Sequence, residues 1–135
     1  MTESERPVAG AKARILVVDD SSLVRLYCRD VLEKAGFEVE QAINGIEAME
    51  KVLEQTFDLV IVDVNMPRMD GFSFIRVLRG SAPHVATLPA LVVTTEAGSQ
   101  DREEARASGA NFYLVKPVSG SDLLRHVAVL TGAPQ

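Results

Sequence analysis

Short apolar runs recur along this chain between longer segments of mixed polarity, and this pattern constrains its fold more than any other feature. A brief run of aliphatic and β-branched residues without polar alternation is typical of a strand buried on both faces of a sheet. Such runs are present at Arg14–Val18, Asp58–Val62, Pro89–Thr94 and Phe112–Val115. The segment Phe37–Ala42 alternates apolar and polar residues, which predicts an edge strand covered on one face.

Apolar residues recur at helical spacing in the segments between these runs. The predicted helices start at Leu23, follow Asn44, and occupy residues 72–78, 100–108 and 123–130. Ser21 or Ser22 can cap the first of them. In the second, the spacing predicts that Ile46, Met49 and Leu53 face the core. Strands that alternate with helices predict a parallel sheet covered on both faces and joined by right-handed crossovers.

Composition places the chain among globular domains. Its 135 residues are 47% hydrophobic and 24% charged, which suits one domain with a substantial core. We expect a flexible leader at 1–13, a folded domain at 14–131 and a tail at 132–135.

The net charge of −5 argues against nucleic acid or an anionic membrane as a partner, and no apolar run approaches the roughly 18 residues of a membrane span. A single cysteine, Cys28, excludes an internal disulfide and favours a reducing cytoplasm.

Polar residues follow most of the predicted strands. In open parallel sheets, ligands bind beside the carboxyl ends of the strands, where the strand order reverses. The residues at these ends are Asp19, Asp20, Asp63, Thr94, Thr95 and Lys116. We therefore expect carboxylates, hydroxyl groups and one ammonium group to lie in a single crevice.

This set of groups is suited to phosphoryl chemistry. Converging carboxylates repel one another unless a cation compensates them, and oxygen ligands without His or Cys suit Mg²⁺. A carboxylate beside Mg²⁺ can attack phosphorus and form an acyl phosphate. Lys116 can neutralise one phosphoryl oxygen, and a threonine hydroxyl can donate a hydrogen bond to another.

Each of these residues also has an ordinary structural explanation. Asp20 can cap a helix, Asp63 can belong to the turn that follows it, and Lys116 can be a solvated surface residue. Thr94 can satisfy the end of a strand. Their joint occurrence at successive strand ends is what favours the chemical interpretation.

Four sequence blocks at these positions resemble a known family. They are RILVVDD, FDLVIVDVNMPRMDG, ALVVTTEAG and NFYLVKP, and together they are similar to the signature blocks of response-regulator receiver domains. The resemblance covers about residues 13–131 and is closest to the stand-alone chemotaxis regulators of the CheY type. It implies a flavodoxin-like, doubly wound sheet of five parallel strands in the order 2-1-3-4-5, with five helices.

The resemblance also implies roles for the acidic residues. Asp63 corresponds to the phosphoacceptor. Asp19 and Asp20 correspond to the acidic pair that holds Mg²⁺ together with Asp63, and the backbone carbonyl of Asn65 corresponds to a further metal ligand. Lys116 corresponds to the lysine that contacts the phosphoryl group.

Other positions match the parts that respond to phosphorylation. Thr94 corresponds to the switch hydroxyl and Tyr113 to the switch aromatic, whose ring is expected to move inward when Thr94 turns toward the phosphoryl group. The readout is then expected on the face formed by residues 100–108, 112–115 and 123–130. The Lys116–Pro117 peptide is expected to be cis.

Access to the site depends on three further residues. Thr95 departs from the family, which usually has a small residue there, and we expect it to narrow the mouth of the site. Asn65 and Glu96 match a pair that flanks the path of an attacking water in chemotaxis-type members, so we expect fast spontaneous dephosphorylation.

The resemblance implies a single-domain response regulator that takes a phosphoryl group from a sensor histidine kinase and catalyses only its own phosphorylation and dephosphorylation. Its output would be a protein contact, either with a flagellar motor switch protein in chemotaxis or with a histidine phosphotransfer protein in a phosphorelay. We expect a cytoplasmic protein that is monomeric before phosphorylation. An aspartyl-phosphate phosphatase is the alternative, but such enzymes carry a second Asp where this chain has Asn65.

Overall fold

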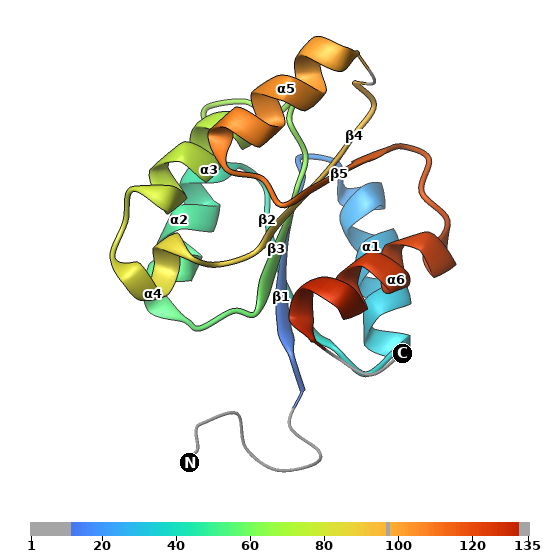
Figure 1. Cartoon of the computed structure of the whole chain (residues 1–135). Coiled ribbons are helices and arrows are strands. Elements are labelled where there is room, and N and C mark those ends of the chain that lie inside the picture. Colours follow the sequence, from blue (N-terminus) through green and yellow to red (C-terminus); the bar gives the residue numbers. More distant parts are fainter. Residues whose placement is uncertain (1–11, 97, 133–135) are drawn as a thin grey trace.

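The computed structural model describes residues 12–96 and 98–132. Its centre is a sheet of parallel strands in the order β2-β1-β3-β4-β5 (Figure 1). The strands are β1 (Arg14–Val18), β2 (Glu38–Ala42), β3 (Leu59–Val62), β4 (Ala90–Thr94) and β5 (Phe112–Val115). The prediction of a doubly wound parallel sheet in the order 2-1-3-4-5 is therefore confirmed. Most of the expected leader and tail lies outside the described residues.

Helices cover both faces of this sheet (Figure 1). They are α1 (Ser22–Lys34), α2 (Gly45–Glu54), α3 (Gly71–Arg79), α4 (Pro83–Ala86), α5 (Ser99–Ser108) and α6 (Gly120–Thr131). Leu32 of α1 and Val127 of α6 pack in the hydrophobic cluster on one face, while Phe74 of α3 and Ala105 of α5 pack in the cluster on the other. No helix in the described part of the chain is long and apolar enough to cross a membrane.

The number of helices corrects the sequence-based expectation. Five were expected, and α4 is a sixth that lies between α3 and β4. This helix is a single turn that begins at Pro83, whose fixed φ suits the first helical position. A single turn is too short to show a helical period, so the apolar pattern could not reveal it.

The predicted inward face of α2 is wrong in part. Leu53 is 64% exposed and Ile46 is also exposed, whereas Ala48 and Val52 are buried. Met49 is partly buried against the core. The buried face of α2 is therefore turned away from the one that the spacing predicted. The contact at the start of the helix accounts for this, because the Gly45 N–H donates to the Met69 carbonyl and a Cβ on Gly45 would lie 2.9 Å from that oxygen. This close contact fixes which face of the helix meets the sheet, and the apolar spacing alone cannot show it.

Hydrogen bonds extend the strand pairing one residue beyond several strand ends. The Asp63 N–H donates to the Val18 carbonyl at 3.0 Å, and the Lys116 N–H donates to the Thr94 carbonyl at 2.7 Å. The Asp19 N–H donates to the carbonyl of Ala42 at the end of β2. The backbones of these polar residues are thus held as firmly as the sheet itself.

Candidate functional site

Three carboxylates meet at the carboxyl edge of the sheet. Asp19 and Asp20 follow β1, Asp63 follows β3, and one carboxylate oxygen from each lies within 4.8 Å of the others. Asp19 is only 3% exposed and Asp63 only 8%, while Asp20 is open to solvent. The predicted convergence is therefore present in the structure, and the donor set is one that a hard divalent cation prefers.

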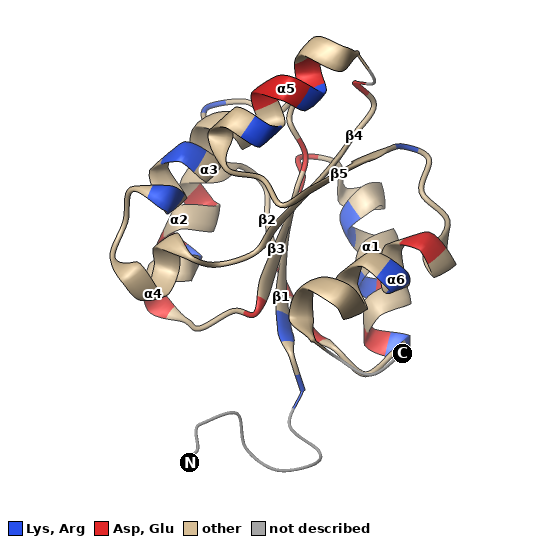
Figure 2. Ribbon diagram, viewed as in Figure 1, with Lys and Arg blue, Asp and Glu red and all other residues tan. Residues whose placement is uncertain are grey.

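Lys116 faces this cluster from the end of β5. Its Nζ donates to Asp19 Oδ2 at 3.0 Å and lies 3.6 Å from Asp63 Oδ1. Figure 2 shows acidic ribbon where β1 ends and basic ribbon in the segment that follows β5. One ammonium group does not neutralise three carboxylates, so the cluster retains negative charge that a bound cation would offset. The Lys116–Pro117 peptide is cis, as expected.

Burial dominates the electrostatics of Asp63. Its pKa is raised mainly by desolvation and further by the charges of Asp19 and Asp20, and the charge of Lys116 only partly opposes this. For Lys116, burial lowers the pKa, but the hydrogen bond to Asp19 and the charge of Asp63 outweigh burial and raise it. Lys116 therefore remains charged at neutral pH, beside a carboxylate that ionises less readily than a solvent-exposed aspartate.

Arg25 of α1 holds the backbone beside the acidic cluster, a role that the sequence pattern did not predict. Its Nη1 donates to the Asp19 carbonyl at 2.7 Å, and its Nε donates to the Gln41 side chain on β2 at 3.0 Å. These two bonds tie the turn that carries the acidic pair to the edge strand. An arginine within an amphipathic helix has no distinguishing pattern, so its partners are visible only in three dimensions.

The segment after Asp63 is shaped by close backbone contact. The Gly71 N–H donates to the Val64 carbonyl at 3.0 Å, and a Cβ on Gly71 would lie 2.3 Å from the Asp63 carbonyl oxygen. Asp70 caps α3 by accepting a hydrogen bond from the Ser73 N–H. The start of α3 therefore rests directly on the backbone of Asp63.

Thr94 and Tyr113 are linked through the main chain of Glu96. Thr94 is fully buried, and its Oγ1 accepts a hydrogen bond from the Glu96 N–H at 3.3 Å. The Tyr113 hydroxyl donates to the Glu96 carbonyl, and the guanidinium of Arg102 on α5 lies 4.9 Å from the centre of the Tyr113 ring. The segment after β4 is thus connected both to the buried hydroxyl and to the aromatic ring on β5.

Asn65 and Glu96 bridge two loops at the edge of the sheet. The Asn65 Nδ2 donates to Glu96 Oε2 at 3.0 Å, which joins the segment after β3 to the segment after β4. Thr95 lies between Thr94 and Glu96 and is exposed. The family resemblance implied that Asn65 and Glu96 flank the approach to the site, but it did not imply the hydrogen bond between them.

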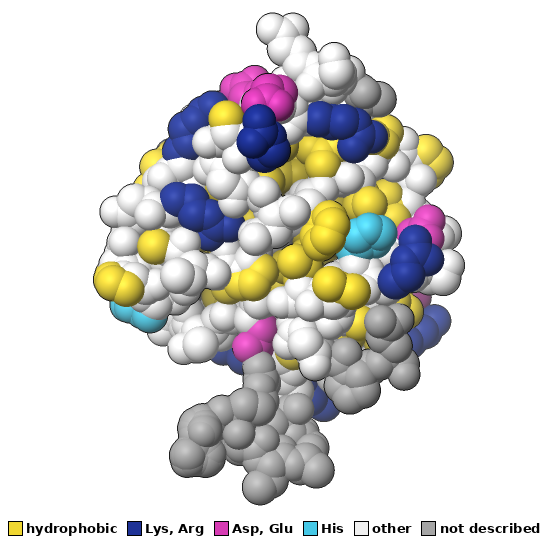
Figure 3. Space-filling model, in the orientation of Figure 1, with side chains coloured by type: hydrophobic (Ala, Val, Ile, Leu, Met, Phe, Trp, Pro, Cys, Tyr) yellow, Lys and Arg dark blue, Asp and Glu magenta, His cyan; other side chains and the backbone are white. Residues whose placement is uncertain are grey.

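A band of apolar side chains crosses the face between α5 and α6 (Figure 3). Phe112 on β5 is 43% exposed, and its ring meets that of His126 on α6 edge to face with 5.4 Å between ring centres. Val129 of α6 is exposed as well. This band lies on the face that the sequence predicted as the readout surface.

Comparison with known proteins places this site in a family. A family model described as the response regulator receiver domain matches residues 15–128. The chemotaxis protein CheY4 of Vibrio cholerae has a similar structure, with 39% identity and a TM-score of 0.84 over 89% of this chain and 99% of that chain. A receiver domain of a sensor histidine kinase from Pseudomonas aeruginosa, described with magnesium in its active-site cleft, has 29% identity and a TM-score of 0.83 over 90% and 99% of the two chains.

Curated relatives are much longer proteins. The gliding motility regulatory protein of Myxococcus xanthus is 40% identical over 123 residues, which are 88% of this chain and 16% of that protein. The sensor protein EvgS of Escherichia coli is 36% identical over 129 residues, which are 95% of this chain and 10% of that protein. This chain therefore spans less than a fifth of the length of these relatives. Because the family model covers most of the chain and the solved relatives share its fold, the chain belongs to the response regulator receiver domains and is of the CheY type.

Proposed function

We propose that this domain is a switch that accepts a phosphoryl group on Asp63 from a phosphorylated histidine of a sensor kinase. The observation that carries the proposal is the position of the Asp63 carboxylate, which is almost buried, within 3.6 Å of the Lys116 ammonium and clustered with two further carboxylates. Receiver domains act with sensor histidine kinases, and the family match extends over the whole site. Folded residues 14–131 would make up the switch.

We further propose that Asp19, Asp20 and Asp63, with the backbone carbonyl of Asn65, hold Mg²⁺. The oxygen-only donor set supports this choice, and so does the magnesium described in the cleft of the Pseudomonas aeruginosa receiver. The cation would supply charge neutralisation for the phosphoryl oxygens.

The chemistry of transfer follows from the residues around Asp63. A carboxylate oxygen of Asp63 forms a bond to phosphorus while the bond from phosphorus to the histidine nitrogen breaks, and the electron pair of that bond leaves with the imidazole. Lys116 is placed to balance charge on the transferred group. The acyl phosphate carries about −2 charge and strong acceptor oxygens, so it favours a conformation in which Lys116 and the Thr94 hydroxyl both contact it.

Movement of Thr94 would carry the signal. Its Oγ1 now accepts from the Glu96 N–H, and a turn toward the phosphoryl group would change that contact. Because the Glu96 carbonyl accepts from Tyr113, the change would reach the aromatic ring on β5. The apolar band between α5 and α6 is the surface that would report it.

Magnesium should stabilise the protein, because a ligand that binds only the folded state raises its melting temperature by mass action. At a concentration about 100 times its dissociation constant, Mg²⁺ should add about 2.7 kcal/mol to the free energy of unfolding.

Asp20→Asn should raise the melting temperature in metal-free buffer, because it removes one of three mutually repelling charges, and it should reduce the magnesium-induced shift. Thermal melts with and without Mg²⁺, at ionic strength matched with NaCl, measure both effects. A clear loss of stability in metal-free Asp20→Asn would contradict the repulsion argument.

A small acyl phosphate donor tests whether the domain accepts a phosphoryl group at all. Incubation with acetyl phosphate and Mg²⁺ should add one phosphoryl group to the intact mass of the wild-type protein, and EDTA should abolish the addition. An unchanged mass in the presence of Mg²⁺ would refute the proposed function.

Thr95 should lengthen the life of the acyl phosphate, because its side chain narrows the approach to the site. We expect Thr95→Ala to shorten the half-life of the phosphorylated protein by about threefold, the effect of a barrier lower by less than about 1 kcal/mol. Loss of the phosphoryl group can be followed by intact mass after removal of the donor. An unchanged half-life removes Thr95 as a barrier to water. The hydrogen bond between Asn65 and Glu96 joins the other two residues expected at the mouth of the site, and their match to the pair in chemotaxis-type members supports fast dephosphorylation.

The output partner is open between two candidates. A motility role is supported by the similarity to CheY4 and to the gliding motility regulatory protein, and a phosphotransfer role by the similarity to receivers in sensor proteins. A pull-down with the phosphorylated domain distinguishes the two roles. It should capture a flagellar motor switch protein if the role is in motility and a histidine phosphotransfer protein if the role is in phosphotransfer. We place the protein in the cytoplasm and expect a monomer before phosphorylation, which ultracentrifugation can measure.

A further inference from the structure

The row of apolar side chains on α2 that the sequence predicted to face the core is largely turned outward. Ile46, Met49 and Leu53 follow one another at intervals of three and four residues, which places them in one line along a helix. Leu53 is 64% exposed and Ile46 is 37% exposed, while Met49 is only partly buried. Scattered apolar residues are common on protein surfaces, but an exposed row at helical spacing is typical of a surface that binds another helix.

A second row, of glutamates, runs beside the apolar row on α2. Glu47, Glu50 and Glu54 have the same spacing displaced by one residue, so the two rows are neighbours along the helix. Figure 2 shows acidic ribbon on α2. Glu47 accepts a hydrogen bond from the Ile43 N–H, whereas Glu50 and Glu54 are exposed and have no ion-pair partner among residues 12–96 and 98–132. We call the two rows together the α2 surface.

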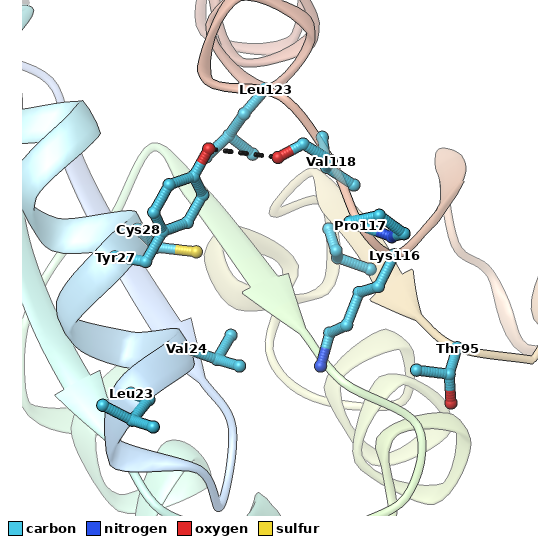
Figure 4. Close-up of a pocket in the computed structure, with 10 residues that line it drawn as sticks. Leu23, Val24, Tyr27, Cys28, Thr95, Lys116, Pro117, Val118 and Leu123 are labelled. Carbon is cyan, nitrogen blue, oxygen red and sulfur yellow. Dashed lines mark hydrogen bonds between the residues drawn. The ribbon is translucent and has the colours of Figure 1, made fainter.

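The α2 surface is separate from the surfaces that serve phosphorylation. An apolar groove of about 630 Å³, lined in part by Leu23 of α1, leads to Lys116 and so belongs to the approach to Asp63 (Figure 4). The apolar band between α5 and α6 lies beside β5, at one edge of the sheet. By contrast, α2 follows β2, the strand at the other edge, and packs beside α3 (Figure 1). A protein bound to α2 would therefore leave the groove and the apolar band accessible.

The charges of the α2 surface restrict what can cover it. The glutamate row would repel an anionic membrane or a nucleic acid. A second copy of α2 would bring three more glutamates to the contact, and the single basic residue of α2, Lys51, lies 3.6 Å from Glu40 on β2. A helix that carries a row of large apolar side chains beside a row of lysines or arginines complements both rows at once.

We propose that the α2 surface binds a basic amphipathic helix of a partner protein, whether or not Asp63 is phosphorylated. Because α2 has 10 residues, it is about 15 Å long and can hold about two to three turns of such a helix. The apolar rows would pack together, and the basic residues of the partner would pair with Glu50 and Glu54. The contact would tether the domain to its partner, while the band between α5 and α6 stays free to report the state of Asp63.

Two synthetic peptides test the surface directly. Both carry leucines along one face of a helix, and one has lysines beside the leucines where the other has glutamates. The lysine peptide should bind the unphosphorylated domain and shift the amide resonances of Ile46 and Leu53, but not that of Val129 on α6. The glutamate peptide should not bind. No binding of the lysine peptide, or shifts confined to residues outside α2, would overturn the inference.

Two substitutions of exposed residues separate apolar packing from charge. Leu53→Ser should weaken binding of the lysine peptide by about tenfold, because it removes the most exposed side chain of the apolar row. Glu50→Lys should weaken that binding by about fivefold and allow the glutamate peptide to bind. Leu26→Ser and Glu33→Lys on α1 are the matched controls, since Leu26 is 54% exposed and Glu33 is an exposed acid. Both controls should bind as the wild-type protein does. Equal affinity of Leu53→Ser and wild type would reveal charge attraction alone and contradict the inference.

Crosslinking in the cells that naturally produce the protein identifies the partner. With photoreactive benzoylphenylalanine in place of Glu54, an adduct should form with a segment that has positive net charge and apolar residues three and four positions apart. Leu53→Ser should abolish the adduct, and Asp63→Asn should leave it unchanged because the contact needs no phosphoryl group. Absence of an adduct, an adduct with an acidic segment or with a second copy of this chain, or an adduct that persists in Leu53→Ser would overturn the inference. Failure of acetyl phosphate to label the domain would refute the proposed function and leave these results unaffected.

Discussion

Asp63→Asn should be more stable than the wild-type protein in metal-free buffer at neutral pH, by roughly 1 to 2 kcal/mol. The Asp63 carboxylate is almost buried, and its pKa is raised by burial and by the neighbouring Asp19 charge. Its ionised form is therefore less favourable in the folded protein than in the unfolded chain. Asparagine has nearly the same shape without the charge, and Lys116 keeps its hydrogen bond to Asp19.

The pH dependence of this difference has a definite sign. A carboxyl group whose folded-state pKa is raised favours folding when protonated, and it loses that contribution as pH rises from its ordinary value of 3.8 through the raised value. The difference in free energy of unfolding between Asp63→Asn and the wild-type protein should thus be small below pH 3.8 and reach its full size above the raised pKa. Urea unfolding in EDTA at a series of pH values measures it.

Asp30→Asn is a suitable control, because Asp30 is an exposed acid on α1 whose partner is Lys34. Its effect on the free energy of unfolding should stay within about 0.5 kcal/mol at every pH. A lower stability of Asp63→Asn at neutral pH would contradict the argument that burial and the neighbouring charges disfavour the Asp63 carboxylate in the folded protein. The variant should also fail to accept a phosphoryl group, so gain of stability and loss of function should arise from the same substitution.

Gly71→Ala should destabilise the protein by about 3 kcal/mol, the upper part of the usual range for an overpacked site. The added Cβ would lie 2.3 Å from the Asp63 carbonyl oxygen and 3.1 Å from the Val64 Cα, both in the backbone. Neither atom can rotate away, so α3 or the end of β3 has to shift. Because that shift moves Asp63, the rate of modification by acetyl phosphate should fall as well.

Gly80→Ala tests whether this effect is specific to position. Gly80 ends the same helix, but a Cβ there would come no closer than 3.7 Å to the nearest atom. The free energy of unfolding should change by less than about 1 kcal/mol, and the rate of modification should not change. Equal losses in the two variants would contradict the argument from contact at Asp63.

The arrangement of the acidic cluster was predictable because strand ends in a parallel sheet share one edge. Asp19 and Asp63 directly follow apolar runs, so the order of strands was enough to bring their carboxylates together. Lys116 was predictable on the same grounds. In each case the residue directly follows an apolar run in the sequence, and the parallel sheet brings the ends of those strands together.

Features that depend on close packing or on side-chain partners were not predictable. The inward face of α2 is set by the contact of Gly45 with Met69, which nothing in the apolar spacing reveals. The bond from Arg25 to the Asp19 carbonyl and the contact of Gly71 with Asp63 are of the same kind. Leu23 follows the helical period and would be placed in the core by pattern alone, yet it is exposed at the groove.

Chemical identification of the modified residue tests the central claim most directly. An acyl phosphate on aspartate is reduced by borohydride to homoserine, which peptide mass spectrometry can locate. After treatment with acetyl phosphate and Mg²⁺, we predict homoserine at position 63 in the wild-type protein and no homoserine in Asp63→Asn. Homoserine at Asp19 or Asp20, or modification that persists in Asp63→Asn, would contradict the assignment of Asp63 as the phosphoacceptor.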